Sequence, residues 1–350
     1  MSKNREDEKN MRYPKFLQEH GTIGFVAPSF GCVMEPYHTL FQNALRRFEQ
    51  MGYQTKLGPN VYADCGIGIS NTPEACADEL MEAYEDAQSD ILISCGGGEL
   101  MCEVLSELDF SRIKNAEPKW YLGYSDNTNF TFLSTTMLDT AAVYGPCASE
   151  FGQEPLHDAM RNALAVMTGK QLHFKGYDKW ELEQLKDAQH PLVGYHLTEE
   201  SRPVLYQYHN PVSGRLAGGC LDCLANLVGT RFDCVAEFNE RYREDGIIWF
   251  LESCDLNVMS IRRALWNLKE AGWFSNAKAF LIGRPGCYGQ EMMGLDQYSA
   301  VTGILGDLNV PILMDLDIGH LPPQIPMLSG ACATVSITDG KFEIQYTLKS

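Results

Sequence analysis

The sequence lacks the long apolar segments that mark membrane and secreted proteins. No stretch reaches the roughly 18 consecutive uncharged apolar residues that a membrane-spanning helix needs. The first 20 residues are highly charged and contain no apolar region of the kind that a secretory signal requires. We therefore expect a cytoplasmic protein without a membrane partner.

Basic residues are also scarce. The chain carries 28 lysines and arginines against 46 aspartates and glutamates, which gives a net charge of −18. Nucleic acids and anionic membranes bind cationic surfaces, because their phosphates must be neutralised. The charge balance therefore predicts that neither is a partner.

The chain has 12 cysteines but lacks the setting in which they would form a disulfide framework. They are scattered through predicted strands and helices of a long chain, so we interpret most of them as small buried apolar residues. Cys220 and Cys223 have Cys-x-x-Cys spacing, yet no second pair of cysteines or histidines completes a zinc set. We expect neither a metal nor a cofactor.

Alternating strands and helices dominate what is present. With 350 residues, 45% of them hydrophobic, the chain is long enough for two domains. Strand and helix patterns alternate over residues 21–150, which predicts an α/β domain with a parallel sheet and helices on both faces. We expect a polar tail at 1–20, a connector at 151–205 and a smaller C-terminal α/β domain at 206–350. The last two strands flank Asp339 and Gly340, a strong β-hairpin signal.

Ser125 lies at the sharpest predicted turn of the first domain. It follows the strand-like "KWYLGY" and precedes the helical "NTNFTFLSTTML". This arrangement is close to the Gly-x-Ser-x-Gly elbow, in which a tight turn exposes a nucleophilic serine. Asn127 replaces the last glycine, and we expect it to tolerate the positive φ of such a turn. The alternative is that Ser125 only caps the helix, which the local sequence alone favours.

A serine nucleophile needs a histidine base that is held by an acid. His320 is the best placed of the eight histidines, because it follows a predicted strand and precedes a proline-rich loop. Glu252 ends the buried-looking strand "IIWFLE", where an unpartnered carboxylate would be costly. Asp255 competes for this role, but we interpret it as a helix N-cap. Ser125, Glu252 and His320 all fall at the carboxyl ends of strands, where open α/β sheets place their sites.

The glycines at 96–98 end another predicted strand. Because they have no side chains, their backbone amides can point at an oxyanion or, equally, at a phosphate. A non-catalytic protein that binds a phosphorylated small molecule through this loop is therefore the alternative function. A third possibility is that the neighbouring Cys95 is a nucleophile rather than a buried strand residue.

Several motifs of the chain resemble, in order, those of the LD-carboxypeptidase family of serine peptidases. They are "TIGFVAPSFG", "GYSDNT", "GGCLDCLANLVGT", "WFLES", "LIGRPG" and "DIGHLPPQIPMLSGACATV". The resemblance covers nearly the whole chain from Gly21. It implies a Ser/Glu/His triad that is carried here by Ser125, Glu252 and His320, and a homodimer.

The resemblance also implies an oxyanion hole made by the backbone amides of Gly98 and Asp126, with Gly97 adjacent. The implied substrate is the L,D-amide of a muropeptide or a microcin C-type peptidyl or aminoacyl nucleotide. The long connector is more similar to the microcin C self-immunity branch, in which a connector aromatic stacks on adenine. Trp180 is the matching candidate, unless it only covers the domain junction. Glu99 departs from the family pattern, and its charge would repel a substrate carboxylate.

Overall fold

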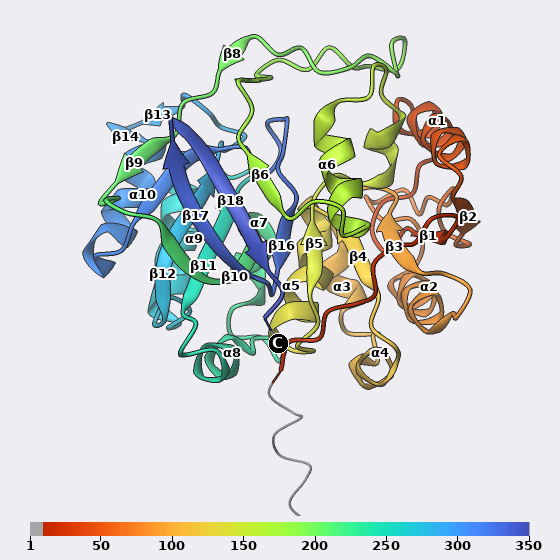
Figure 1. Cartoon of the computed structure of the whole chain (residues 1–350), viewed down its shortest axis with the longest axis horizontal. Helices are drawn as coiled ribbons and strands as arrows, with labels where there is room; N and C mark the ends of the chain where they lie inside the picture. The colour runs from red at the N-terminus through yellow and green to blue at the C-terminus, as the bar shows by residue number, and fades with distance from the viewer. Residues whose placement is uncertain (1–9, 350) are drawn as a thin grey trace, which may run out of the picture.

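The computed structural model describes residues 10–349 and contains two large sheets. Figure 1 shows the N-terminal half, red to yellow, on one side and the C-terminal half, largely green to blue, on the other. The buried apolar side chains of both halves form one continuous cluster. The two-part α/β architecture expected from the alternating pattern is confirmed.

The N-terminal sheet has six strands in the order β16-β5-β4-β3-β1-β2. Its parallel strands are β1 (Thr22–Val26), β2 (Gln54–Leu57), β3 (Ile91–Ser94), β4 (Trp120–Gly123) and β5 (Ala142–Tyr144). The four central ones are buried almost throughout, as parallel strands with helices on both faces must be. The sixth strand, β16 (Met327–Ser329), comes from far along the chain and pairs antiparallel with β5.

Among the described residues, five α-helices and two 3-10 helices belong to this half. They are α1 (Tyr37–Gln50), α2 (Pro73–Glu85), α3 (Met101–Val104), α4 (Phe110–Asn115), α5 (Thr128–Thr136), η2 (Ser125–Asn127) and η3 (Ala148–Gly152). α2 begins as its sequence indicates, because Thr72 accepts a hydrogen bond from the Ala75 amide and Pro73 occupies the first turn. α5 is buried along its whole length, since it contacts strands of both halves.

The C-terminal sheet has eight strands in the order β6-β18-β17-β10-β11-β12-β15-β9. Its parallel centre consists of β10 (Val212–Cys220), β11 (Ile247–Glu252), β12 (Ala277–Gly283) and β15 (Ile312–Leu316). The helices of this half are α7 (Leu221–Leu227), α8 (Val235–Arg241), α9 (Val258–Glu270), α10 (Gln297–Leu305) and the 3-10 helix η4 (Gly306–Leu308). A small ribbon of β13 (Glu291–Met292) and β14 (Leu295–Asp296) precedes α10.

The chain ends in the expected hairpin. β17 (Cys332–Thr338) and β18 (Lys341–Thr347) pair antiparallel, and the two residues between them, Asp339 and Gly340, both have positive φ. Such a turn matches the right-handed twist of the strands that it joins. The Asp-Gly signal in the sequence is therefore confirmed.

The stretch between the two halves contains regular elements of its own. α6 (Asp158–Met167) is followed by β6 (His173–Lys175), β7 (Lys179–Trp180), β8 (Glu199–Glu200) and β9 (Val204–Tyr206). β6 and β9 pair with β18 and β15 at opposite edges of the C-terminal sheet. In Figure 1 the part of this stretch around β8 passes over the top of the molecule. The domain limits at 151 and 205 stay a prediction.

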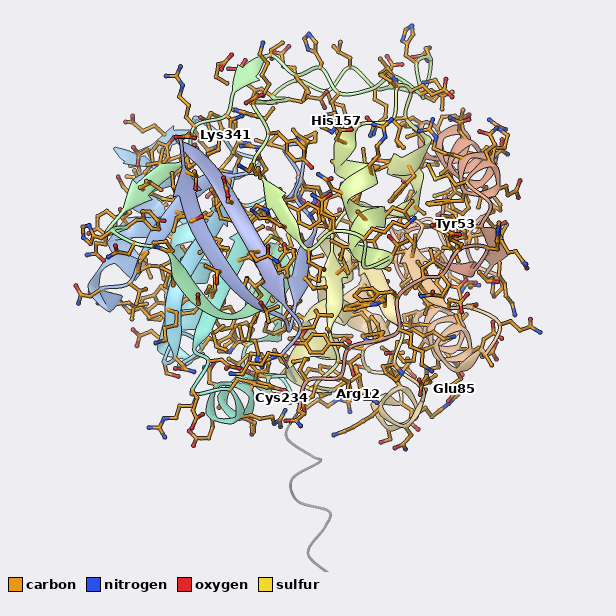
Figure 2. All side chains as sticks on the ribbon, viewed as in Figure 1. Arg12, Tyr53, Glu85, His157, Cys234 and Lys341 are labelled. Carbon is orange, nitrogen blue, oxygen red and sulfur yellow. The ribbon has the colours of Figure 1, made fainter. Side chains whose placement is uncertain are left out.

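Segments distant in the sequence join the two halves. Arg12, low in the molecule in Figure 2, donates to Thr140 Oγ1 at 2.7 Å and 3.0 Å, while the next residue, Tyr13, donates to the Lys349 carbonyl at 2.8 Å. Ser329 of β16 accepts a hydrogen bond from Thr135 of α5 at 2.9 Å. No helix within residues 10–349 is long and apolar enough to cross a bilayer.

Candidate active site

Ser125 lies in a tight bend between β4 and α5. Tyr124 continues the extended backbone of the strand, and the 3-10 helix η2 (Ser125–Asn127) leads into α5. Ser125 has a φ of 62°, in the left-handed region. This conformation is uncommon for a residue other than glycine and costs on the order of 1–3 kcal/mol. The bend holds the serine at the carboxyl end of its strand.

The expectation that Asn127 takes the positive φ of the turn is wrong. Its φ is −61°, so the strain falls on Ser125 instead. The buried Asn127 side chain ties the bend to its surroundings. Nδ2 donates to the Gly96 carbonyl at 2.9 Å and to the Tyr124 carbonyl at 3.0 Å, while Oδ1 accepts from the Tyr121 hydroxyl at 2.5 Å. A glycine at this position would make none of these side-chain bonds.

The Ser125 hydroxyl faces His320. Ser125 Oγ and His320 Nε2 are 2.9 Å apart, and His320 Nδ1 is 2.8 Å from Glu252 Oε2. Both are hydrogen-bonding distances, so the structure brings together the three side chains that we selected from the sequence. The capping interpretation of Ser125 does not describe the structure, because Asn127 occupies the N-cap position of α5.

The loop after β15 holds the imidazole in place. Gly319, with a φ of 96°, precedes His320, and a Cβ at Gly319 would lie 2.3 Å from Glu252 Oε2. Only glycine therefore fits at position 319. The Tyr124 ring lies 5.0 Å from the imidazole, measured between ring centroids. The Glu252 side chain is 0% exposed and that of His320 is 17% exposed.

Glu252 and His320 shift each other's pKa. Burial alone would raise the pKa of Glu252, but the charge and hydrogen bond of His320 hold that pKa below its usual value. Burial likewise opposes charge on the ring, yet Glu252 raises the pKa of His320 well above its usual range. The two groups therefore favour an ion pair. The imidazole is a neutral base only when the pH exceeds its raised pKa.

Tyr144 is a site residue that our sequence interpretation missed. Its hydroxyl donates a short hydrogen bond to Glu252 Oε1 and accepts one from the Ser125 amide at 3.2 Å. It is fully buried at the end of β5. The signal that could have found it is its place at the carboxyl end of a parallel strand, the same signal that selected Ser125 and Glu252.

The glycine loop lies against Ser125. A Cβ on Gly97 would lie 3.1 Å from Ser125 Oγ, and a Cβ on Gly98 would lie 2.0 Å from Ser29 Oγ. Gly98 also has a φ of 144°, a conformation that side chains rarely allow. The Gly98 amide makes no hydrogen bond to another group within residues 10–349. It is therefore available to a bound ligand.

The Asp126 carboxylate connects the loop at Ser29, the first residue of α3 and the first turn of α5. It accepts hydrogen bonds from Ser29 Oγ, from the Met101 amide at 2.8 Å and from Asn129 Nδ2 at 2.9 Å. Burial raises the pKa of Asp126, while these hydrogen bonds oppose the rise. The network fixes the backbone of Asp126 directly after Ser125.

Two cavities open beside Ser125. The larger, about 300 Å³, is lined by His320, the glycine loop and Glu150, among others. The smaller, about 100 Å³, is lined by a set of acidic and thiol side chains: Glu99, Asp126, Asp222, Asp255, Cys102, Cys220, Cys223 and Cys254. Within the described part of the chain, no lysine or arginine lines either cavity. The site is therefore acidic on both sides of the serine.

Glu99 lies at the rim that the two cavities share. Partial burial and the charges of Asp255, Asp126 and Asp222 raise its pKa. Asp255 is not the helix cap that we expected, because Asn257 caps α9 by accepting from the Ser260 amide at 2.9 Å.

Trp180 lies apart from these cavities. It is 3% exposed on β7, with its ring 4.7 Å from that of Tyr288 and the Arg284 guanidinium 4.9 Å above it. It lines neither cavity beside Ser125. No contact in the structure supports the stacking role, which stays a prediction.

Cys95 is fully buried, and burial raises the pKa of its thiol well above the usual value. A thiol that is both covered and protonated is a poor nucleophile. The geometry therefore does not favour the third possibility, nucleophilic catalysis by Cys95.

Family profiles match both halves of the chain. The profile of the LD-carboxypeptidase N-terminal domain matches residues 23–145, and that of the C-terminal domain matches residues 213–335. The chain belongs to the LD-carboxypeptidase family. It is thus a serine-type carboxypeptidase by family, and the resemblance seen in its motifs is confirmed.

Relatives of this family extend over nearly the whole chain. A probable murein peptide carboxypeptidase of Bacillus subtilis is 26% identical over 336 residues, which cover 93% of this chain and 92% of the relative. A putative carboxypeptidase of Vibrio cholerae is 22% identical and covers 96% of this chain and 98% of its own length.

Solved structures show the same fold at low sequence identity. The microcin C7 self-immunity protein MccF in complex with aspartyl sulfamoyl adenosine has a TM-score of 0.79 at 20% identity, covering 96% of this chain and 99% of that one. MccF in complex with glutamyl sulfamoyl guanosine has a TM-score of 0.81 at 19% identity, with the same coverage. At such identities the likeness establishes the fold of the LD-carboxypeptidase described here.

Proposed function

We propose that this LD-carboxypeptidase family member hydrolyses an amide bond of a small peptide, with Ser125 as nucleophile, His320 as base and Glu252 as the acid that holds the base. The observation that carries the proposal is the pair of hydrogen bonds, 2.9 Å and 2.8 Å long, that links the three side chains. The left-handed bend at Ser125 supports it, because backbone strain of this kind clusters at functional sites.

The chemistry follows from this order of groups. As Ser125 Oγ attacks the carbonyl carbon, its proton passes to His320 Nε2 and Glu252 stabilises the imidazolium. The imidazolium then gives the proton to the leaving amine, which departs as the amide bond breaks. A water molecule, deprotonated by the same imidazole, releases the acyl group and restores the serine.

The amides of Gly98 and Asp126 would stabilise the oxyanion of the tetrahedral intermediate. The Gly98 amide has no other acceptor in the described residues, and a preorganised donor of this kind stabilises charge that develops during the reaction. Tyr144 would act as a positioning residue, because its hydroxyl joins Glu252 Oε1 to the Ser125 amide.

The substrate supported best is a muropeptide in which an L,D-amide is cleaved and a D-amino acid leaves. Two relatives are named for this substrate: the probable murein peptide carboxypeptidase, which covers 93% of this chain, and a murein tetrapeptide carboxypeptidase of Pseudomonas aeruginosa, which covers 72%. The acidic cavity of about 100 Å³ beside the serine favours a substrate that carries an amine, as peptides with a diamino acid do. The charge of Glu99 works against the carboxylate of the leaving D-amino acid, as it would against any anionic group at this rim, so it does not favour the muropeptide.

An aminoacyl nucleotide is the second candidate substrate. The structural similarity to MccF, whose complexes hold aminoacyl sulfamoyl nucleosides, supports it. The lining of the two cavities is acidic and, among the described residues that form it, contains no lysine or arginine, which opposes binding of an anionic linker. We therefore rank it below the muropeptide.

Side-by-side turnover of a murein tetrapeptide and an aminoacyl sulfamoyl adenosine tests this ranking. We expect the wild type to release the D-amino acid from the tetrapeptide faster, and Ser125→Ala to release neither product. Turnover of the nucleotide alone would reverse the ranking. Equal turnover by Ser125→Ala would reject the serine mechanism.

A non-catalytic phosphate-binding protein was the alternative from another class. It would need cationic or amide donors around the glycine loop and no activated serine. The distances at His320 and the acidic lining both favour the hydrolase. Labelling of Ser125 by a fluorophosphonate, which reacts with activated serines, separates the two functions.

We also propose, from family resemblance alone, that the protein is a homodimer. Light scattering coupled to size-exclusion chromatography would report twice the chain mass of 39.2 kDa. A single-chain mass at micromolar concentration would contradict it.

A further inference from the structure

The Cys-x-x-Cys pair lies beside the proposed triad. Cys220 ends β10 directly before α7, and Cys223 lies in the first turn of that helix. The Cys220 thiol donates to Asp222 Oδ2 at 3.4 Å, and it also lies near the ligand atoms of Glu252 and His320. The Cys220 amide donates to Thr128 Oγ1 at 2.9 Å, which fixes the cysteine against α5. The proposed mechanism uses neither thiol.

Three groups of different chemistry converge at this point. One ligand atom each from Cys220, Glu252 and His320 lies within 4.8 Å of the other two. Glu252 and Cys220 are buried, and the His320 side chain is partly exposed. His320 Nδ1 is the ring nitrogen on the Glu252 side, because Nε2 faces Ser125.

Thiolate, imidazole and carboxylate are the ligands that Zn²⁺ combines most often. Zn²⁺ holds them at about 2.0–2.3 Å in tetrahedral geometry, so the ligand atoms around a bound ion lie within about 4 Å of one another. The thiol needs to approach the other two groups slightly, and His320 Nδ1 and Glu252 Oε2, now 2.8 Å apart, need to separate slightly. Water, or the adjacent thiol of Cys223, can complete the fourth position.

We propose that Cys220, Glu252 and His320 form a binding site for Zn²⁺ or a similar divalent cation. Our sequence interpretation set a metal aside, because no second pair of ligands has zinc spacing. The other two ligands, Glu252 and His320, lie 32 and 100 residues after Cys220, so only folding of the chain brings them close to this cysteine.

The site is reachable from the surface. His320 lines the cavity of about 300 Å³, and Cys220 lines the cavity of about 100 Å³, with Ser125 at the edge of both. The acidic side chains of the smaller cavity attract a divalent cation towards the thiol. The ion therefore has an entry path that needs no movement of a strand.

Bound metal would inhibit the enzyme, and this consequence rests on the proposed function. The cation displaces the thiol proton of Cys220 to solvent and the proton that Nδ1 shares with Glu252 to solvent or to Nε2. An imidazole that is bound through Nδ1 and protonated at Nε2 cannot accept the Ser125 proton. The free hydrolase would thus be active and the metal-bound form inactive.

Cobalt absorption tests the site without reference to activity. Co²⁺ is titrated into the reduced full-length protein, and thiolate ligation is read from the thiolate-to-cobalt charge-transfer band. We expect one bound ion per chain with this band, and at least about tenfold weaker binding in Cys220→Ser. Cys102→Ser is the matched control, because this thiol lines the same cavity but lies outside the three-residue set; it should bind like wild type.

A cobalt complex without the thiolate band, or one unchanged in Cys220→Ser, would overturn the proposal. If Cys220→Ser does not fold, as judged by circular dichroism, His320→Asn takes its place, since its side chain is partly exposed. His320→Asn must also bind cobalt at least about tenfold more weakly. Wild-type affinity in that variant would overturn the proposal as well.

The inhibitory consequence is tested by fluorophosphonate labelling of Ser125 with and without Zn²⁺. We expect Zn²⁺ to block labelling, EDTA to restore it, and the inhibition constant to rise at least about tenfold in Cys220→Ser, relative to that variant's own metal-free rate. If metal-free protein is not labelled, the proposed function fails while the cobalt result still decides the metal site. Full labelling at saturating metal would show that the ion does not compete with the triad.

Discussion

The two halves of the molecule contribute different kinds of chemistry to one site. The N-terminal sheet contributes backbone geometry: the strained bend at Ser125 and the open amide of Gly98. The C-terminal sheet contributes an ionisable pair, Glu252 and His320, whose pKa values move in opposite directions. A serine alone is a weak nucleophile and an ion pair alone has nothing to activate, so the proposed mechanism needs both halves.

Tyr144 complicates this division. It belongs to the N-terminal sheet, yet its hydroxyl contacts Glu252 of the C-terminal sheet and the backbone of Ser125. Conversely, β16 follows β15 of the C-terminal sheet in the chain, but it pairs with β5 and so belongs to the N-terminal sheet. Contacts of this kind set the distance between serine and histidine, so the alignment depends on the interface as well as on either sheet.

Removing the proposed nucleophile should have the largest effect. Ser125→Ala should lower kcat about 10⁴-fold or more, because binding and the oxyanion amides alone retain only a residual rate. Ser149→Ala is the matched control, since this serine lines the same cavity and should keep a rate within a few-fold of wild type. Steady-state turnover of the preferred substrate measures both. Equal losses in the two variants would argue against a special role for Ser125.

Removing the charge of Glu252 tests two effects of this carboxylate: it stabilises the imidazolium, and it raises the pKa of His320. Glu252→Gln should lower kcat by about 10³–10⁴-fold, since the imidazolium loses its stabilising partner. In the wild type, Glu252 raises the pKa of His320, so the rate should increase with pH through that raised pKa. Without the carboxylate, burial dominates and the pKa falls, so the acid limb should move to lower pH.

The pH dependence of fluorophosphonate labelling, recorded with EDTA present, checks this shift. An acid limb at the same pH in both proteins would mean that Glu252 does not control the ionisation of His320.

Adding a side chain to the glycine loop of the N-terminal half should lower kcat less than the changes at Ser125 and Glu252. Gly98→Ala should lower kcat about 10²-fold, because the backbone must leave its φ of 144° and its amide turns from the oxyanion. Gly96→Ala is the control: its Cβ would meet nothing nearer than the Phe30 carbonyl at 3.5 Å. Steady-state measurement of kcat and KM for both variants tests whether the Gly98 amide stabilises the oxyanion. A loss in KM alone would point to substrate binding and not to the oxyanion.

Tyr144→Phe tests the contact that joins the halves. We expect a loss of kcat of at least about tenfold, since a hydrogen bond to a charged group contributes at least about 1.5 kcal/mol. Tyr346→Phe removes another buried hydroxyl, which donates to the Pro326 carbonyl at 2.7 Å. It should lower the melting temperature and leave kcat unchanged. A melting-temperature loss without a kcat loss in Tyr144→Phe would reduce that residue to a structural one.

The smallest effect on kinetics is expected from Glu99, at the rim that the two cavities share. Glu99→Gln should lower the KM of an anionic substrate several-fold and leave kcat unchanged, with a smaller difference at high salt because exposed charges are screened. Glu107→Gln removes an exposed carboxylate outside both cavities and serves as control. A KM change of the same size in both variants would show only a general effect of net charge.

Strand ends were predictable from the sequence, and side-chain networks were not. The apolar runs that end at Gly123, Glu252 and Leu316 indicate buried parallel strands by local composition alone. The positive φ at Ser125, the hydroxyl bridge from Tyr144 and the convergence of Cys220 on Glu252 depend on neighbours that are distant in sequence. No local pattern contains these distances. Our assignment of positive φ to Asn127 failed for this reason.

The sequence by itself determined the α/β class, the terminal hairpin and the family, because hydrophobic period, turn chemistry and ordered motifs are local properties. Only the tertiary structure decided that Ser125 and His320 lie 2.9 Å apart, that Trp180 packs away from both cavities, and that thiols and carboxylates surround the serine. The physical reason is that packing of two sheets into one core determines which strand ends meet, and packing is a property of the whole chain.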